Sequence, residues 1–281
     1  MTMPELPEVE TLARALAPRL TGARILDARA TSHPKWAGAQ FARDASTVEI
    51  SRRGKHILMQ LDDGRVLDVH LGMTGAIALL DARARQPLPE PVPHERLLLA
   101  MQRGRQCFHF RLTDIRGFGH ALLLTRDADG ELDLPALRRM GPEPLGDWPV
   151  EDFLVTCSRR RTPIKALLLD QSIVAGVGNY LADEALFAAR VHPAAPAVDL
   201  STRKLRQLHA TVRDTIAASI ANGGASLRNY RQVDGSLGES QEHLLAYGRA
   251  GLPCVRCGTL LRKLVVAGRG TTICPRCQRL P

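Results

Sequence analysis

Four cysteines near the C-terminal end carry the clearest chemical signal in the sequence. They form two Cys-x2-Cys pairs separated by sixteen residues: Cys254, Cys257, Cys274 and Cys277. Two such pairs can present four thiolates in the tetrahedral arrangement that zinc prefers, with no open position for a substrate. We therefore expect one structural Zn²⁺, which supplies the stability that a segment of about thirty residues cannot obtain from its own core.

A second candidate is the glycine pair in the stretch IVAGVGNY, residues 173–180. Two glycines just before a predicted helix allow backbone N–H groups to approach a phosphate, and Asn179 adds a side-chain donor. Tight packing of the backbone against another segment fits the same pattern equally well. The third glycine of a dinucleotide fingerprint is missing, so we expect no nucleotide cofactor.

The N-terminal stretch PELPEVE, residues 4–10, is typical of a helix that begins with proline and carries acids in its first turn. Val9, Leu12 and Leu16 recur every three to four residues and predict an amphipathic helix that ends near Pro18 and Gly22. Because the first eight residues contain acids and lack an apolar core, we expect no secretory signal here.

The remaining elements fall into two regions. Between residues 23 and 125, strand-like runs at 57–61, 66–71, 97–101 and 107–112 predict two hairpins within a sandwich or barrel. Residues 140–146, MGPEPLG, indicate a hinge. Beyond it the periodicity is helical at 164–168, 181–186 and 205–220, the last with Ser201 as N-cap and a stop at 222–224.

Charge and composition favour a nucleic-acid partner. Lys and Arg exceed Asp and Glu by 38 − 29 = 9, and 44% of the residues are apolar, as in an ordinary globular protein. No apolar run is long enough to span a membrane. Four of the six cysteines are clustered near the C-terminal end, while Cys107 and Cys157 stand alone. This is not the spacing of a disulfide framework and indicates a reducing, cytoplasmic compartment.

Five motifs occur in a fixed order along the chain: PELPEVE, RRGKHILMQL at 52–61, HLGMTG at 70–75, GVGN at 176–179, and the two cysteine pairs. Together they closely resemble the bacterial formamidopyrimidine-DNA glycosylase family, which includes endonuclease VIII. The resemblance covers nearly the whole chain. PELPE favours the formamidopyrimidine branch, whereas Asn179-Tyr180-Leu181 is closer to endonuclease VIII.

The resemblance implies an α+β multidomain fold. An N-terminal helix and β-sandwich would occupy residues 1–134, a hinge 135–150, a helical helix–two-turn–helix domain 151–245, and a zinc finger 246–281. Damaged double-stranded DNA would lie between the first two domains. The implied activity is that of a monomeric, nucleoid-associated glycosylase and AP lyase that excises 8-oxoguanine and formamidopyrimidines and cleaves the strand by β,δ-elimination.

By the same resemblance, Pro4 supplies a secondary amine that attacks the sugar C1′ of a flipped nucleotide, and Glu5 protonates the ring oxygen. Lys55 assists the first elimination and Arg269 the second. The amine must be a free N-terminus, yet Pro4 follows Met1-Thr2-Met3. We therefore expect translation to start at Met3, with later removal of that methionine.

The resemblance also assigns DNA contacts. Met73, Arg116 and Phe118 would fill the space that a flipped base leaves. The family usually reads DPRRFG here, whereas residues 114–119 read DIRGFG, so Gly117 replaces one arginine and removes a charged contact. The further DNA contacts implied are His94, Arg161, Lys165 and Asn179.

Three other functions fit parts of the pattern. An endonuclease VIII-like enzyme would keep the chemistry but act on oxidised pyrimidines. A non-catalytic relative would bind damaged DNA without forming a covalent intermediate. The third alternative is a zinc-ribbon protein that acts on RNA.

Overall fold

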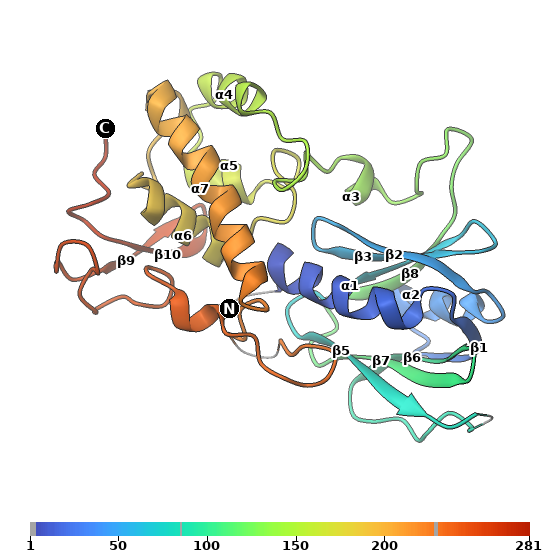
Figure 1. The fold of residues 1–281 in the computed structure, drawn as a ribbon. Helices are drawn as coiled ribbons and strands as arrows, with labels where there is room; N and C mark the ends of the chain where they lie inside the picture. The colour runs from blue at the N-terminus through green and yellow to red at the C-terminus, as the bar shows by residue number, and fades with distance from the viewer. Residues whose placement is uncertain (1–3, 85, 228–229) are drawn as a thin grey trace.

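The protein has a sheet-containing lobe and a helical lobe, with a zinc-finger hairpin attached to the second (Figure 1). The computed structural model describes residues 4–84, 86–227 and 230–281. The expected translation start at Met3 therefore lies outside the described residues. No helix in these ranges is both long and apolar enough to cross a membrane.

Two four-stranded antiparallel sheets form the sandwich. Both predicted hairpins are confirmed, because β3 pairs with β4 and β6 with β7. One sheet has the order β1-β6-β7-β5, and its strands are Arg24–Ala30, Glu95–Arg103, Gln106–Asp114 and Gly75–Ala82. The other has the order β2-β3-β4-β8, with strands Thr47–Arg53, His56–Leu61, Val66–His70 and His120–Leu124.

Helix α1 (Leu6–Leu20) packs its apolar stripe into this sandwich. Val9, Leu12 and Leu16 are almost fully buried in the same core cluster as strand residues of both sheets. Pro18 lies inside the last turn and the helix continues to Leu20, so the predicted end of the helix is confirmed. The packing fixes the direction in which the N-terminal residues of α1 leave the lobe.

The helical lobe is built around α7 (Thr202–Ala221), whose apolar face is buried against its neighbours. The Ser201 hydroxyl accepts a hydrogen bond from the Lys204 N–H at 3.4 Å, so the predicted N-cap is confirmed. The other helices are α4 (Val150–Ser158), α5 (Ile164–Leu169) and α6 (Asn179–Ala189). Two short elements lie in the sheet lobe, α2 (Pro34–Ala37) and the 3₁₀ turn Gly38–Ala42. The remaining short elements are α3 (Pro135–Arg138) and the 3₁₀ turns Ala197–Asp199 and Ser240–His243.

A two-residue turn closes the zinc-finger hairpin of β9 (Arg262–Val266) and β10 (Arg269–Ile273). Ala267 and Gly268 both have positive φ, 50° and 70°, as a type I′ turn requires. This turn makes Arg269 the first residue of β10 and presents it at the tip of the hairpin.

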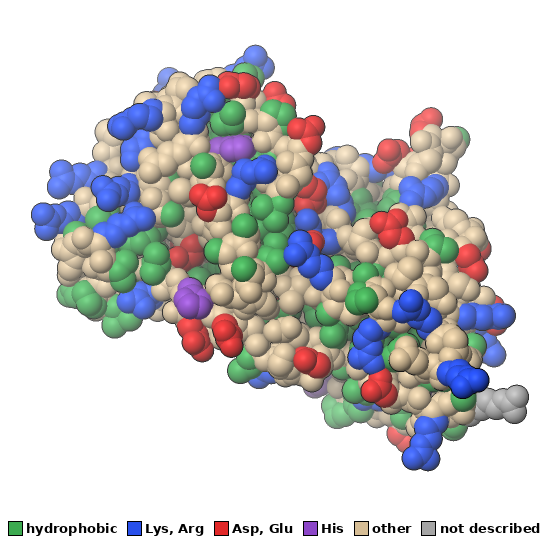
Figure 2. Space-filling view, in the orientation of Figure 1, with side chains coloured by type: hydrophobic (Ala, Val, Ile, Leu, Met, Phe, Trp, Pro, Cys, Tyr) green, Lys and Arg blue, Asp and Glu red, His purple; other side chains and the backbone are tan. Residues whose placement is uncertain are grey.

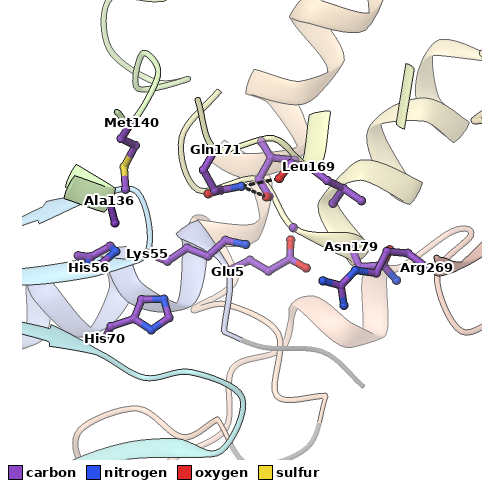
Figure 3. A pocket seen from close by; sticks show the side chains of 12 residues that line it. Glu5, Lys55, His56, His70, Ala136, Met140, Leu169, Gln171, Asn179 and Arg269 are labelled. Carbon is purple, nitrogen blue, oxygen red and sulfur yellow. Dashed lines mark hydrogen bonds between the residues drawn. The ribbon is translucent and has the colours of Figure 1, made fainter. Parts of the chain in front are cut away.

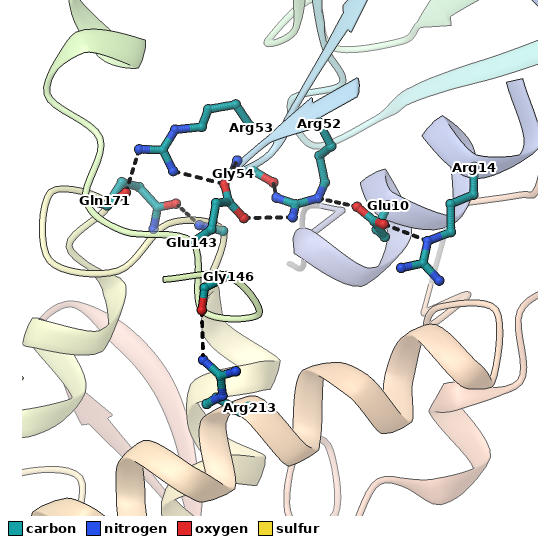
Figure 4. A network of polar contacts seen from close by, with 11 residues as sticks. Glu10, Arg14, Arg52, Arg53, Gly54, Glu143, Gly146, Gln171 and Arg213 are labelled. Carbon is teal, nitrogen blue, oxygen red and sulfur yellow. Dashed lines mark hydrogen bonds and ion pairs between the residues drawn. The ribbon is translucent and has the colours of Figure 1, made fainter. Parts of the chain in front are cut away.

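A polar clamp joins the linker to the sheet lobe (Figure 4). The Glu143 carboxylate accepts a hydrogen bond from the Gly54 N–H at 2.6 Å and lies 2.7 Å from the Arg52 guanidinium. Arg52 also binds Glu10 of α1 at 2.6 Å. Since Lys55 follows Gly54, the clamp fixes the turn that carries this lysine. The domain limits expected from the sequence stay a prediction.

We expect Leu16→Ala to lower the free energy of unfolding by about 2–5 kcal/mol, because it leaves a cavity at a fully buried position of the α1 core. Urea unfolding monitored by circular dichroism measures the change. Arg14→Ala is the matched control on the same helix, since its ion pair with Glu10 is mostly solvent-exposed on the Arg14 side and should contribute about 0.5 kcal/mol or less. Equal losses in the two variants would contradict this packing.

Candidate active site

A cavity of about 320 Å³ lies between the two lobes and the zinc-finger hairpin (Figure 3). Three of the four side chains assigned to catalysis, Glu5, Lys55 and Arg269, line it, and Pro4 directly precedes Glu5. Asn179, assigned to DNA, also lines it. The remaining lining residues are His56, His70, Ala136, Met140, Leu169, Gln171, Val177 and Gly178.

The Glu5 carboxyl group is buried at the start of helix α6. It is 1% exposed and accepts hydrogen bonds from the backbone N–H groups of Tyr180 at 3.0 Å and Leu181 at 3.3 Å. Burial raises the pKa of Glu5 to about 7, while Lys55 opposes the rise and Glu8 adds to it. A carboxyl group with this pKa can both donate and accept a proton near neutral pH.

The glycines of the GVGN stretch allow this close approach. A Cβ on Gly178 would lie 2.2 Å from the Glu5 carboxyl carbon, and one on Gly176, whose φ is +79°, 2.7 Å from Leu6. Of the two interpretations of this motif, tight packing is the one that the structure shows. The expected phosphate site is occupied by Glu5, because this carboxylate already accepts the N–H groups at the start of α6.

Glu8 is a second buried acid that sequence reasoning did not assign to the site. Its carboxylate accepts hydrogen bonds from the Tyr180 hydroxyl at 2.8 Å, the Ala225 N–H at 2.7 Å and the Glu5 N–H at 2.7 Å. Burial raises its pKa to about 7. An acid in a first helical turn is common at helix starts, so its position in the sequence gives no sign of these partners.

Two cations approach the cavity from different parts of the chain. Lys55 is 8% exposed, and burial lowers its pKa, while Glu5 and Glu8 act in the opposite direction and Arg269 adds to the lowering. Lys55 is thus easier to deprotonate than an exposed lysine. Arg269 is exposed at the hairpin tip. A third basic group, the His70 imidazole, has its pKa lowered to about 3, chiefly by burial, and is neutral.

The structure places Lys165 away from solvent, and its assignment to DNA stays a prediction. Its side chain is 0% exposed, and the ammonium binds Asp183 at 2.6 Å and the Thr271 hydroxyl at 2.7 Å. The Gly270 carbonyl accepts hydrogen bonds from Lys165 at 3.2 Å and from the Asn179 amide at 2.9 Å. Both side chains therefore position the residue that follows Arg269.

Met73, Arg116 and Phe118 come together on the sheet lobe. The Arg116 guanidinium lies over the Phe118 ring at 4.5 Å and contacts the Met73 sulfur at 3.9 Å, and Phe118 is 49% exposed. Gly117 between them has a φ of +65°, which favours glycine, and its carbonyl accepts a hydrogen bond from the Lys35 ammonium at 3.2 Å. The Lys35 ammonium therefore lies beside position 117, where the family usually has an arginine.

The other two assigned DNA contacts are exposed and lie elsewhere. His94 has a φ of +63°, and its carbonyl accepts a hydrogen bond from the Asp114 N–H at 2.9 Å, at the base of the segment that carries Arg116. Arg161 is exposed in the connection between α4 and α5. Neither residue lines the cavity.

The four cysteines fit a zinc ion. Their sulfur atoms all lie within 4.8 Å of one another, and the Cys257 sulfur is 3.5 Å from those of Cys274 and Cys277. Four sulfurs bound to zinc at about 2.3 Å would lie about 3.8 Å apart, so only a small adjustment is needed. The ion would close the finger and leave no position for a reactant.

A basic surface covers the same end of the molecule (Figure 2). Next to Cys257 and Cys277, four arginines surround a second cavity of about 410 Å³: Arg190, Arg256, Arg276 and Arg279. This surface accounts for part of the net positive charge and favours anionic partners.

Three family models match the chain in order. They are the formamidopyrimidine-DNA glycosylase N-terminal domain over residues 3–121, the H2TH domain of the same enzyme over residues 140–231, and a zinc finger found in FPG and IleRS over residues 251–280. This order, with the buried acid and the two cations around one cavity, defines the class of zinc-finger DNA glycosylases. The chain belongs to the formamidopyrimidine-DNA glycosylase family.

Relatives in this family cover the whole length. The formamidopyrimidine-DNA glycosylases of Herpetosiphon aurantiacus and Thermomicrobium roseum are 40% and 42% identical, over 98% and 99% of this chain and all of theirs. The crystal structure of the MutM (Fpg) protein of Thermus thermophilus is 39% identical, with a TM-score of 0.86, over 99% of this chain and 100% of its own. A Lactococcus lactis Fpg bound to DNA with an abasic site is 31% identical, with a TM-score of 0.82, over 98% and 99%. The expected family and fold class are confirmed.

Between pH 5 and 7 we expect the free energy of unfolding to fall as the pH rises. Glu5 and Glu8 bind protons more tightly in the folded chain, with pKa values of about 7 against 4.5, so raising the pH favours the unfolded state. Glu8→Gln should reduce this slope by about 1 kcal/mol per pH unit, measured by urea unfolding at pH 5, 6 and 7.

Glu10→Gln is the control for this slope, because the pKa of Glu10 is lowered by its hydrogen bond to Arg52, against the effect of burial, and the group titrates below the tested range. Its slope should equal that of the parent protein. A Glu8→Gln slope that also equals the parent's would contradict the raised pKa of Glu8.

Removal of zinc by a chelator should unfold the finger and leave the sandwich folded, because the finger core contains few buried residues besides its cysteines. Limited proteolysis should then cut within residues 251–280, and added Zn²⁺ should restore protection. Cleavage that starts in the sandwich instead would show that the ion is not what stabilises this segment.

Proposed function

We propose that this protein is a monomeric glycosylase and AP lyase that excises oxidised purines from duplex DNA in base excision repair. The observation that carries the proposal is the buried Glu5 carboxyl, with a pKa of about 7, in a cavity that Lys55 and Arg269 also line. Solved structures of similar proteins support the substrate class, since they are complexes with DNA that contains Fapy-dG, an abasic site or carbocyclic 8-oxo-G.

In the proposed reaction, the flipped nucleotide enters the cavity and the amine nitrogen of Pro4 bonds to C1′ of its sugar. The damaged base leaves as its bond to C1′ breaks. Glu5 protonates the ring oxygen, so the C1′–O bond opens and an iminium ion forms between Pro4 and the sugar. Pro4 can do this only as the first residue of the chain, because a proline inside a peptide bond has no free amine.

The iminium acidifies the neighbouring C2′ position, and loss of that proton expels the 3′ phosphate. A second elimination expels the 5′ phosphate. Lys55 acts in the first step, for which its lowered pKa suits it, and Arg269 in the second. Lys165 and Asn179 act indirectly by fixing Gly270, next to Arg269.

The DNA would run between the lobes, with Met73, Arg116 and Phe118 filling the space left by the flipped base. Their mutual contacts and the exposed Phe118 ring support this role. Lys35 would replace the charge of the arginine that Gly117 displaces. His94 and Arg161 would contact the backbone. The named relatives are bacterial, which supports a cytoplasmic protein that acts on the nucleoid.

Borohydride trapping tests the proposal on a duplex with 8-oxoguanine opposite cytosine. Protein whose first residue is shown by mass spectrometry to be Pro4 should form a covalent adduct. Glu5→Gln should slow base excision by about 10²–10⁴-fold, because the general acid is lost. Arg14→Ala, on the exposed side of the same helix, is the control and should react at the parent rate.

Three outcomes would change the conclusion. Equal trapping by protein that retains Met1, Thr2 and Met3 would exclude Pro4 as the nucleophile. Excision of thymine glycol but not of 8-oxoguanine would move the substrate to oxidised pyrimidines. Tight binding to lesion DNA with no adduct would indicate a non-catalytic relative.

A further inference from the structure

A row of three histidines crosses the outer face of the sheet β2-β3-β4-β8. His56 on β3 pairs with His70 on β4, and His70 pairs with His120 on β8. Directly paired residues point to the same face of a sheet. The alternate residues Ile57, Val69 and Ala121 belong to the sandwich core, so the imidazoles point away from it.

Asp68 joins two of these imidazoles. It lies two residues before His70 on β4 and therefore on the same face. One carboxylate oxygen is 3.0 Å from Nδ1 of His56, and the other is 2.8 Å from Nε2 of His120. The ligand atoms of the three side chains all lie within 4.8 Å of one another.

This donor set matches a divalent transition metal. Imidazole and carboxylate are zinc ligands, and two ligand atoms at about 2.1 Å from one ion lie about 3.0–3.4 Å apart. The measured separations of 2.8 and 3.0 Å approach that range. Rigid, hydrogen-bonded strands hold all three side chains, so little ordering remains to oppose binding.

The surroundings of Asp68 also favour a cation. The side chain is 0% exposed, and a buried carboxylate requires a charge partner or good hydrogen bonds. Among the described residues, only the two imidazoles make polar contacts with the Asp68 carboxylate, and no Lys or Arg pairs with it. The His120 side chain is 20% exposed and offers a path for an ion and for a water ligand.

We propose that His56, Asp68 and His120 form a second metal site, for a divalent transition ion such as Zn²⁺, separate from the four-cysteine site. The ion links β3, β4 and β8 at the end of the sheet where β3 begins, directly after Lys55. His56 also lines the catalytic cavity, so the site lies directly behind its wall.

Metal content tests the proposal on the full chain with its structural zinc in place. The protein is incubated with excess Zn²⁺, passed through a desalting column, and analysed by mass spectrometry of the metal. We expect two zinc ions per chain. His120→Gln and Asp68→Asn should each retain one, whereas His109→Gln, a buried histidine on the other sheet, should retain two.

Cobalt gives a second, independent measurement. With zinc kept in the four-cysteine site, one equivalent of Co²⁺ should give ligand-field bands without thiolate-to-cobalt charge transfer, and His120→Gln should not give these bands. If Asp68→Asn does not fold, the partly exposed His120 position still decides the question.

One zinc ion per chain in the parent protein would overturn the proposal and leave Asp68 with the hydrogen bonds from its two imidazole neighbours alone. Retention of the second ion by His120→Gln would also overturn it. The readout is metal content rather than lesion excision, so its failure is distinct from failure of the proposed function.

Discussion

The burial of two carboxyl groups, Glu5 and Glu8, between α1 and the helical lobe is the interaction on which the site depends. Removing acids from water is costly unless donors replace the lost hydration. The donors here are backbone N–H groups at the start of α6 and at Ala225, together with the Tyr180 hydroxyl. They belong to the helical lobe, whereas the acids belong to the helix packed in the sandwich. The hydrogen bonds to the two acids therefore also hold the two lobes together. Burial in this interface raises the pKa of each acid to about 7.

Lys55 and Arg269, the two cations at the cavity of Glu5, are held in position by separate sets of contacts. Lys55 follows Gly54, which the linker residue Glu143 holds. Arg269 stands at a type I′ turn, and the buried pair of Lys165 and Asp183 fixes the backbone just after it. A buried ion pair is weak evidence for stability, but here its hydrogen bonds define where a strand lies. The site thus needs the linker, the finger and both lobes in place at once.

Much of the fold could be predicted from local patterns. The two sandwich hairpins, the helix that begins after Ser201 and the four-cysteine zinc site all follow from periodicity, capping or spacing within about thirty residues. These patterns predict structure reliably because the interacting residues are near one another in the sequence. The resemblance to the family predicted catalytic roles for Glu5, Lys55 and Arg269, and in the structure all three line one cavity. The burial of Lys165 could not be predicted, because nothing local distinguishes a buried lysine from an exposed one.

The sequence by itself determined the two sandwich hairpins, the main helical segments, the positions of the four cysteines that fit zinc and the family to which the chain belongs. Only the tertiary structure decided what those elements present to each other. It assigned the start of α6 to Glu5 rather than to a phosphate, gave Glu8 its partners, and aligned His56, His70 and His120 across three strands. The physical reason is that pKa values and ligand geometry depend on desolvation and on neighbours far apart in the chain, which no local spacing encodes.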